Sequence, residues 1–107
     1  MITFIAKMRV SAANQPAYEA ILDHVRDQTR ANEPGVVYYD WAKAVDDPER
    51  YVVVEVYADP AAHTTHMATP WVRDSLPESV RLVDGGFDIQ QFVTPGGEPA
   101  VRQFKAG

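Results

Sequence analysis

One carboxylate of the chain stands among aromatic residues. Glu55 is followed two positions later by Tyr57, and Tyr39 and Trp41 belong to the preceding β-rich segment. If the two segments pair as a hairpin, these four side chains share one face, because side chains alternate along a strand. A carboxylate in such surroundings either reaches a donor at the sheet edge or anchors a ligand in an apolar pocket. Both interpretations stay open at this point.

Two of the histidines lie one turn apart on a predicted helix. His63 and His66 belong to a stripe at helical spacing, which places imidazoles where apolar residues usually face a sheet. Such a histidine is either a structural residue of the core or a general base that shares a compartment with Glu55 and Trp71. The pair could also bind a metal ion. No third ligand stands at a recognisable spacing, so no metal site is predicted.

Composition and motif content exclude several other chemistries. The 107 residues include no cysteine, which removes disulfides, thiolate metal sites and a cysteine nucleophile. We find no phosphate-binding glycine loop, no nucleophilic serine motif and no flavin or nicotinamide fingerprint. The formal net charge is −5 with acids and bases mixed along the chain, so nucleic-acid binding is not expected. The first residues do not resemble a signal peptide and no apolar run could span a bilayer, so we expect a cytoplasmic protein without membrane contact.

Hydrophobic periodicity and turn signals predict four strands and two or three helices. Strands are expected at residues 2–10, 36–44, 51–57 and 87–93, and helices at residues 15–31 and from residues 60 and 70 onward. The turn at Asp46–Arg50 would centre a hairpin in which Val37 lies near Tyr57. Pro77 is expected to end or kink the last helix. The order β-α-β-β-α-β predicts an α+β ferredoxin-like fold, a four-stranded antiparallel sheet with helices on one face.

The third predicted strand carries apolar residues on both faces. Val52, Val54 and Val56 alternate with a second set that includes Tyr51 and Val53. A sheet that helices cover on one face only should be polar on the other. Neither face is polar here, so we expect a second subunit to pack on the bare face and form a homodimer.

The domain is expected to span residues 1–93. Residues 94–107 include Pro95, Gly96, Gly97 and Pro99 and lack a hydrophobic period. They predict a C-terminal arm or a flexible tail.

A series of short motifs in this order and spacing resembles the antibiotic biosynthesis monooxygenase family. The motifs are Glu33-Pro34-Gly35, Tyr39, Asp46-Asp47-Pro48 with Arg50, Glu55-x-Tyr57, Ala62-x-x-x-His66 and Thr69-Pro70-Trp71. The similarity runs from about residue 3 to residue 93. It implies a dimeric α/β barrel in which two sheets face each other, with a pocket between sheet and helices in each subunit. Family members include oxygenases that oxidise phenols and quinols with dioxygen and no bound cofactor. Others degrade haem, and one relative isomerises a phosphorylated sugar.

The resemblance and the residues together predict a cofactor-independent monooxygenase that acts on a small electron-rich aromatic substrate with dioxygen. His66 and Glu55 are the predicted catalytic residues. The predicted substrate-binding residues are the ring-bearing side chains Tyr39, Trp41, Tyr57, His63 and Trp71. Two alternatives stay open: a small-molecule isomerase, and a non-catalytic binding or stress-response dimer. A cavity bordered by both His66 and Glu55 would favour an enzyme.

Overall fold

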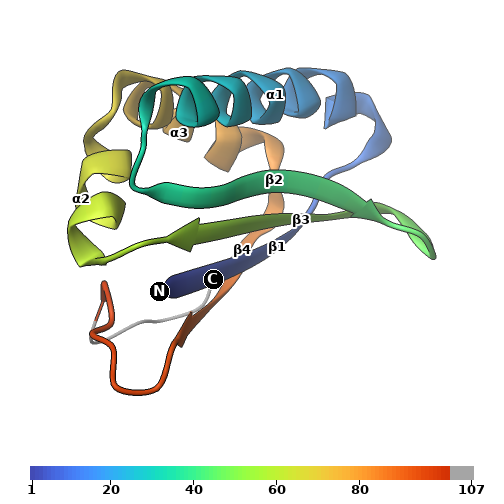
Figure 1. Ribbon diagram of the computed structural model, residues 1–107. Helices are drawn as coiled ribbons and strands as arrows, with labels where there is room; N and C mark the ends of the chain where they lie inside the picture. The colour runs from blue at the N-terminus through green and yellow to red at the C-terminus, as the bar shows by residue number, and fades with distance from the viewer. Residues whose placement is uncertain (102–107) are drawn as a thin grey trace.

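The computed structural model describes residues 1–101 and consists of a sheet with helices packed on one side (Figure 1). The strands are β1 (Ile2–Arg9), β2 (Val36–Ala44), β3 (Asp47–Tyr57) and β4 (Asp84–Val93). The helices are the short 3-10 helix η1 (Ala12–Asn14), α1 (Gln15–Asn32), α2 (Pro60–Ala68) and α3 (Pro70–Leu82). The strand order is β2-β3-β1-β4, and every neighbouring pair is antiparallel. The predicted ferredoxin-like α+β fold is confirmed.

Helix α1 buries one apolar stripe against the sheet. Pro16 occupies the first turn, where its missing N–H is not needed, and Tyr18, Leu22 and Val25 face the sheet and are buried. After the helix the chain passes directly against α2. A Cβ atom on Gly35 would lie 2.8 Å from the Cβ of Ala62, so only glycine fits at this crossing.

The junction between α2 and α3 is held by a single threonine. The hydroxyl of Thr69 donates to the carbonyl of His66 at 2.8 Å and accepts from the backbone N–H of Val72, which caps α3. Pro77 was expected to end or kink the last helix, and it does not end it, because α3 continues to Leu82. Pro77 and Arg73 are both exposed, so water can bind the carbonyl that the proline leaves without an N–H donor.

In the β2–β3 hairpin the predicted residues share one face of the sheet, but the turn is shorter than predicted and the register shifts once near residue 37. Tyr39 pairs with Glu55 and Trp41 with Val53, as expected. The expected pairing of residue 37 with Tyr57 is wrong, because the register shifts between residues 36 and 38 and Tyr57 pairs with residue 36. The turn is confined to residues 45–46, so β3 begins at residue 47 rather than 51.

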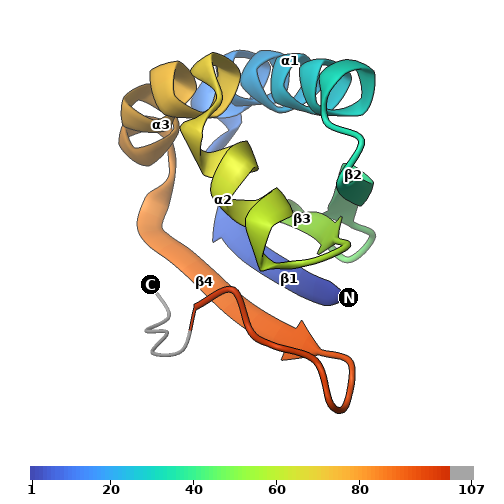
Figure 2. The same cartoon turned by 60° about the vertical axis from the view of Figure 1, so that its left-hand side comes forward.

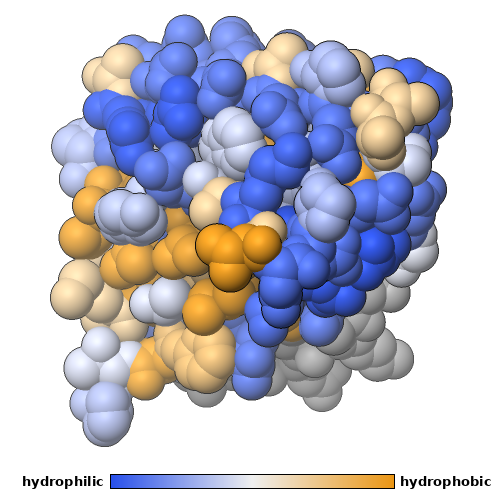
Figure 3. Space-filling view, turned by 90° about the vertical axis from the view of Figure 1, so that its right-hand side faces the viewer, coloured by the Kyte–Doolittle hydropathy of each residue, from blue (hydrophilic) through white to orange (hydrophobic). Residues whose placement is uncertain are grey.

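The two faces of the sheet differ in burial. On the helix-covered face Tyr51, Val53 and Tyr57 are buried, whereas the three valines between them are only half-buried. The bare face also carries Tyr38, which is 50% exposed, and Phe92, which is 45% exposed. Figure 3 shows a largely hydrophilic helical layer and apolar side chains gathered below it, at the level of the sheet. Within residues 1–101, none of the helices is both long and apolar enough to cross a bilayer.

After β4 the chain turns back along that strand (Figure 2). The amide of Gln91 secures the returning segment: its oxygen accepts from the backbone N–H of Ala100 at 2.9 Å, and its nitrogen donates to the carbonyl of Val101 at 2.8 Å. Both residues pack against the cluster of Ile2, Phe4 and Tyr57. Residues 94–101 therefore lie against the domain, and the remainder of the predicted tail lies outside the described residues.

Candidate active site

A partly open cavity of about 380 Å³ lies between the sheet and the helices. Side chains from β1, β2, β3, β4 and all three α-helices line it, and Val101 closes part of one wall. Most of the lining is apolar. The polar residues of the lining are Tyr18, Tyr39, Glu55, His63, His66, Ser75 and Ser79. An apolar cavity with a few converging polar groups is the usual form of a small-molecule site.

His66 is held from behind by Glu33. The imidazole is 2% exposed, and its Nδ1 lies 3.0 and 3.1 Å from the two carboxylate oxygens of Glu33. Because a carboxylate only accepts, Nδ1 carries the hydrogen and Nε2 of the neutral ring presents its lone pair. Nε2 is directed toward Glu55, whose Oε1 lies 3.7 Å away, too far for a direct hydrogen bond. The Nε1–H of Trp71 donates to the same Glu33 at 2.8 Å and fixes its orientation.

Glu55 lies between His66 and Tyr57 at the cavity wall. Its side chain is 19% exposed, and it accepts a short hydrogen bond from the hydroxyl of Tyr57. Burial raises the pKa of Glu55 above its ordinary value, and the charge of Glu33 adds to this effect. The Tyr57 hydrogen bond and His66 act in the opposite direction. The carboxyl group therefore titrates closer to neutral pH than an exposed glutamate.

His63 forms an aromatic part of the wall rather than a charged one. Its ring stacks on Phe4 with centroids 4.9 Å apart and meets the edge of Tyr57 at 5.1 Å. Burial lowers the pKa of His63, and the neighbouring His66 lowers it further. A neutral imidazole at this position can contact an aromatic ligand and still offer one donor or acceptor.

The structure brings together four of the seven predicted site residues in the cavity lining: Tyr39, Glu55, His63 and His66. Tyr57 lies behind Glu55 and contacts both histidine rings. Trp41 and Trp71 pack against the core and lie outside this lining. Each donates its indole N–H to a carboxylate, Trp41 to Asp23 at 2.9 Å and Trp71 to Glu33.

Sequence reasoning missed the importance of Glu33 and Tyr18. Glu33 was named only within the Glu33-Pro34-Gly35 motif of the family resemblance, and Tyr18 was not among the predicted site residues. A buried histidine needs a partner for its second nitrogen, but no local sequence signal identifies Glu33 as that partner. Nothing local distinguishes Tyr18 from an ordinary core tyrosine.

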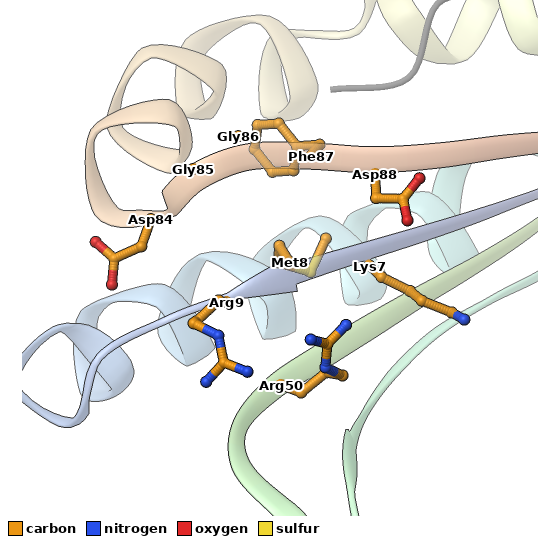
Figure 4. Close-up of a pocket in the computed structure, with 9 residues that line it drawn as sticks. All are labelled: Lys7, Met8, Arg9, Arg50, Asp84, Gly85, Gly86, Phe87 and Asp88. Carbon is orange, nitrogen blue, oxygen red and sulfur yellow. The ribbon is translucent and has the colours of Figure 1, made fainter.

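A second cavity, of about 300 Å³, lies where β1 and β4 lose register (Figure 4). Gly85 and Gly86 adopt positive φ angles of 79° and 81°, which allows the bulge in β4. Arg9 in its lining already binds Asp47 at 2.7 Å and Glu49 at 3.2 Å, and acids of β4 accompany the other cations. Acids and bases are therefore mixed around this cavity, whereas the cavity between sheet and helices has a mostly apolar lining. Within the described residues no group of three or more His, Asp or Glu side chains is arranged to hold a metal ion.

Comparison with known proteins gives a family match over most of the chain. Residues 1–76 match the family model described as antibiotic biosynthesis monooxygenase. No curated protein matches the sequence significantly.

Solved structures with the same fold are numerous. A crystal structure of an antibiotic biosynthesis monooxygenase has a TM-score of 0.80 and 21% identity, over 88% of this chain and 98% of that one. Rv0793 from Mycobacterium tuberculosis has a TM-score of 0.80 and 22% identity, over 87% and 93% of the two chains. A conserved protein from Methanosarcina mazei Go1 has a TM-score of 0.80 and 18% identity, over 85% and 89%. At these identities the similarity establishes a shared fold.

Proposed function

The chain belongs to the antibiotic biosynthesis monooxygenase family, and we propose that it is a cofactor-independent monooxygenase that oxidises a small electron-rich aromatic compound of the quinol or phenol type with dioxygen. The observation that carries this proposal is the arrangement around His66. Glu33 holds Nδ1, and Nε2 is directed to the cavity beside Glu55. An imidazole presented in this way is suited to remove a proton from a bound hydroxyl group.

Deprotonation is the step that the protein must supply. Triplet dioxygen reacts slowly with closed-shell molecules, whereas a phenolate readily gives up one electron. The substrate radical and superoxide then combine to a hydroperoxide at a ring carbon, and loss of water yields the quinone. One oxygen atom enters the substrate and the other leaves as water. The substrate provides both hydrogens and all electrons, so no external reductant enters the balance.

The residues around the cavity have separate roles in this scheme. His66 accepts the hydroxyl proton at Nε2, and Glu33 stabilises the imidazolium that results. Glu55, whose orientation Tyr57 maintains, binds the substrate hydroxyl or accepts its proton in turn. Tyr39 and His63 contact the aromatic ring, and the apolar lining excludes water from the reacting oxygen species.

The test is oxygen uptake by metal-free protein with a panel of quinols, naphthols and anthrones. His66→Ala is expected to lower the rate about 10²–10⁴-fold, the usual contribution of a placed general base. His24→Ala is the matched control, because His24 is exposed and lies outside the cavity lining. Uptake that requires added flavin or metal, or a His66→Ala rate equal to wild type, would contradict the proposal. If no substrate is consumed, the isomerase and binding-protein alternatives gain support.

We also propose that the protein is a homodimer whose bare sheet faces pack together. The support is a continuous row of side chains across the four strands, formed by Tyr38, Val56, Thr3 and Phe92 in register order. Tyr38 and Phe92 are about half exposed, which is unusual for aromatic rings on a sheet. Covering this row with the same row of a second copy would bury it.

A further inference from the structure

One short segment of the cavity wall belongs to no helix or strand. Among the described residues that line the cavity, Val101 is the one that lies outside these elements. It belongs to residues 94–101, which turn back along β4 and are called the C-terminal strap from here on (Figure 2). The other walls are held by the backbone hydrogen bonds of helices and strands. The strap is therefore the part of the wall that can move without breaking such an element.

The strap begins with a turn that is fixed beside the start of β1. Pro95 and Gly96 occupy the two central positions, and the φ angle of Gly96 is 86°. The N–H of Gly97 donates to the carbonyl of Thr94 at 2.8 Å, and these features together are typical of a type II turn. The N–H of Thr94 also donates to the carbonyl of Met1 at 3.1 Å. The turn thus provides a pivot for the rest of the strap.

One side chain holds the other end of the strap. Gln91 faces the helix-covered side of the sheet, because it pairs with the buried Phe4 of β1. Its Oε1 accepts from the N–H of Ala100 at 2.9 Å and from that of Val101 at 3.3 Å, and its Nε2 donates to the carbonyl of Val101 at 2.8 Å. A single amide therefore binds three backbone groups of the strap. Removing it would release this end without removing a hydrogen bond of the sheet.

The end of the strap that Gln91 holds covers the part of the cavity near the proposed base. It packs against the cluster of Ile2, Phe4 and Tyr57, of which Ile2 is 1% exposed and Tyr57 0% exposed. Phe4 lines the cavity and stacks on His63. The ring of Tyr57 lies 5.6 Å from that of His66. The closed strap therefore shields the cluster that borders both histidines, and lifting it would admit water there.

We propose that the C-terminal strap is a gate over this end of the cavity and that Gln91 is its latch. The inference rests on the proposed function in one respect, because it takes the cavity to bind a ligand. The closed strap keeps water from the proton-accepting groups, and the open strap admits and releases the ligand. Opening breaks three hydrogen bonds to one side chain and the packing of two small apolar residues, so it requires much less free energy than global unfolding. Gln91 lies outside the cavity lining and acts through the strap, as a positioning residue.

The first test measures opening without a ligand. The chain has no cysteine, so a single introduced thiol reports on its own position. Ile2→Cys places a thiol in the cluster beneath the strap. Val10→Cys places a reference thiol in the other core cluster, at a residue that is 0% exposed. The rate of labelling with dithiobis(nitrobenzoic acid) measures how often each thiol becomes accessible.

Urea separates opening of the strap from unfolding of the whole domain. Labelling at Ile2→Cys should be more than about tenfold faster than at Val10→Cys and nearly independent of low urea concentrations, because opening the strap exposes little surface. Labelling at Val10→Cys should rise steeply with urea, because it requires global unfolding. An equally steep urea dependence at Ile2→Cys would overturn the proposal. This comparison needs no change at Gln91, so it decides the question even if variants at that position fail to fold.

Gln91→Leu tests the latch, because leucine fills similar space and forms none of the three hydrogen bonds. In the Ile2→Cys background it should speed labelling about 10–100-fold, the effect of losing two or three hydrogen bonds, and leave the weak urea dependence unchanged. Gln90→Leu is the matched control, since Gln90 is exposed on the opposite face of the same strand, and it should leave the rate unchanged. A Gln91→Leu rate equal to that of Gln90→Leu would overturn the proposal.

A second test shows whether opening admits a ligand. Stopped-flow fluorescence of 2-naphthol gives its association and dissociation rates. A gate limits both rates, so Gln91→Leu should raise both by a similar factor, about fivefold or more, and change the dissociation constant less than about twofold. A fixed wall would change the dissociation rate alone and the dissociation constant with it. That result, rates equal to wild type, or a wild type that binds no 2-naphthol would overturn the gate.

The two proposals can fail separately. If thiol labelling and both binding rates respond to Gln91→Leu as expected but no quinol, naphthol or anthrone consumes oxygen, the oxygenase function is wrong and the gate stands. If oxygen is consumed but Gln91→Leu leaves labelling and both binding rates at their wild-type values, the gate is wrong and the function stands.

Discussion

The contact between Glu33 and His66 makes a specific prediction for Glu33→Gln. Two donors converge on Glu33: Nδ1–H of His66 at 3.0 Å and Nε1–H of Trp71 at 2.8 Å. Glutamine has one acceptor oxygen, and its nitrogen can only donate. The indole N–H can never accept, so the glutamine oxygen must take the place of Oε2, which lies 2.8 Å from Trp71 and 3.1 Å from Nδ1 of His66. The NH₂ group then takes the place of Oε1, 3.0 Å from Nδ1. The imidazole can accept that hydrogen only if its proton moves from Nδ1 to Nε2.

The size of the effect follows from one buried hydrogen bond. Keeping the wild-type tautomer in the variant would set the NH₂ group against Nδ1–H, and only the 3.1 Å contact to the glutamine oxygen would remain. A buried donor left without a good acceptor costs about 1–3 kcal/mol. The Nε2–H tautomer should therefore exceed the other by roughly fivefold to 150-fold. Because that tautomer has no lone pair at Nε2, turnover should fall by about the same factor while the fold remains intact. Trp71→Phe in the Glu33→Gln background removes the indole constraint and should restore turnover several-fold.

Two assays check this reasoning. Long-range ¹⁵N NMR of the neutral histidine rings distinguishes Nδ1–H from Nε2–H directly, and the exposed His24 provides the reference ring. Oxygen uptake with the best aromatic substrate measures turnover in the single and double variants. A Glu33→Gln protein that keeps the Nδ1–H tautomer would refute the argument. So would a Trp71→Phe change that lowers turnover equally in both backgrounds.

Three further predictions concern pH, assembly and the core. Folding raises the pKa of Glu55, so its contribution to stability is present below the ordinary pKa of 4.5 and is lost as pH rises through the raised value. Glu55→Gln should therefore gain thermal stability relative to wild type over that pH range. A stability difference that does not change with pH would contradict this. Val54→Lys on the bare sheet face should shift the sedimentation equilibrium toward monomer, whereas Val45→Lys at the exposed hairpin tip should not. A wild-type protein that sediments as a monomer would contradict the proposed homodimer. Thr29→Val should raise the free energy of unfolding by about 1 kcal/mol in urea titrations, because the Thr29 hydroxyl is buried without a partner among the described residues. A loss of stability would show that this hydroxyl forms a hydrogen bond in solution.

Part of the candidate site could be predicted and part could not. The hairpin pattern placed Tyr39 beside Glu55, and the helix stripe turned His66 toward the sheet, because both follow from short periodic patterns. The two tryptophans looked equally suitable as pocket walls. Their indole N–H groups found carboxylates at Asp23 and Glu33 instead, and such pairings depend on where distant elements cross.

The sequence by itself determined the order of strands and helices, the face on which each apolar side chain lies and the family to which the chain belongs. The first two properties depend on spacing within single elements, and the family was recognised from a resemblance of short motifs along the chain, so no long-range contact is needed to predict them. Only the tertiary structure decided which carboxylate holds which nitrogen of His66. That contact joins residues 33 positions apart, and Gly35 allows it because a Cβ atom there would lie only 2.8 Å from the Cβ of Ala62 as β2 begins. The close crossing places Glu33 behind His66 and leaves Glu55 on the cavity side, an arrangement set by the packing of helices on the sheet.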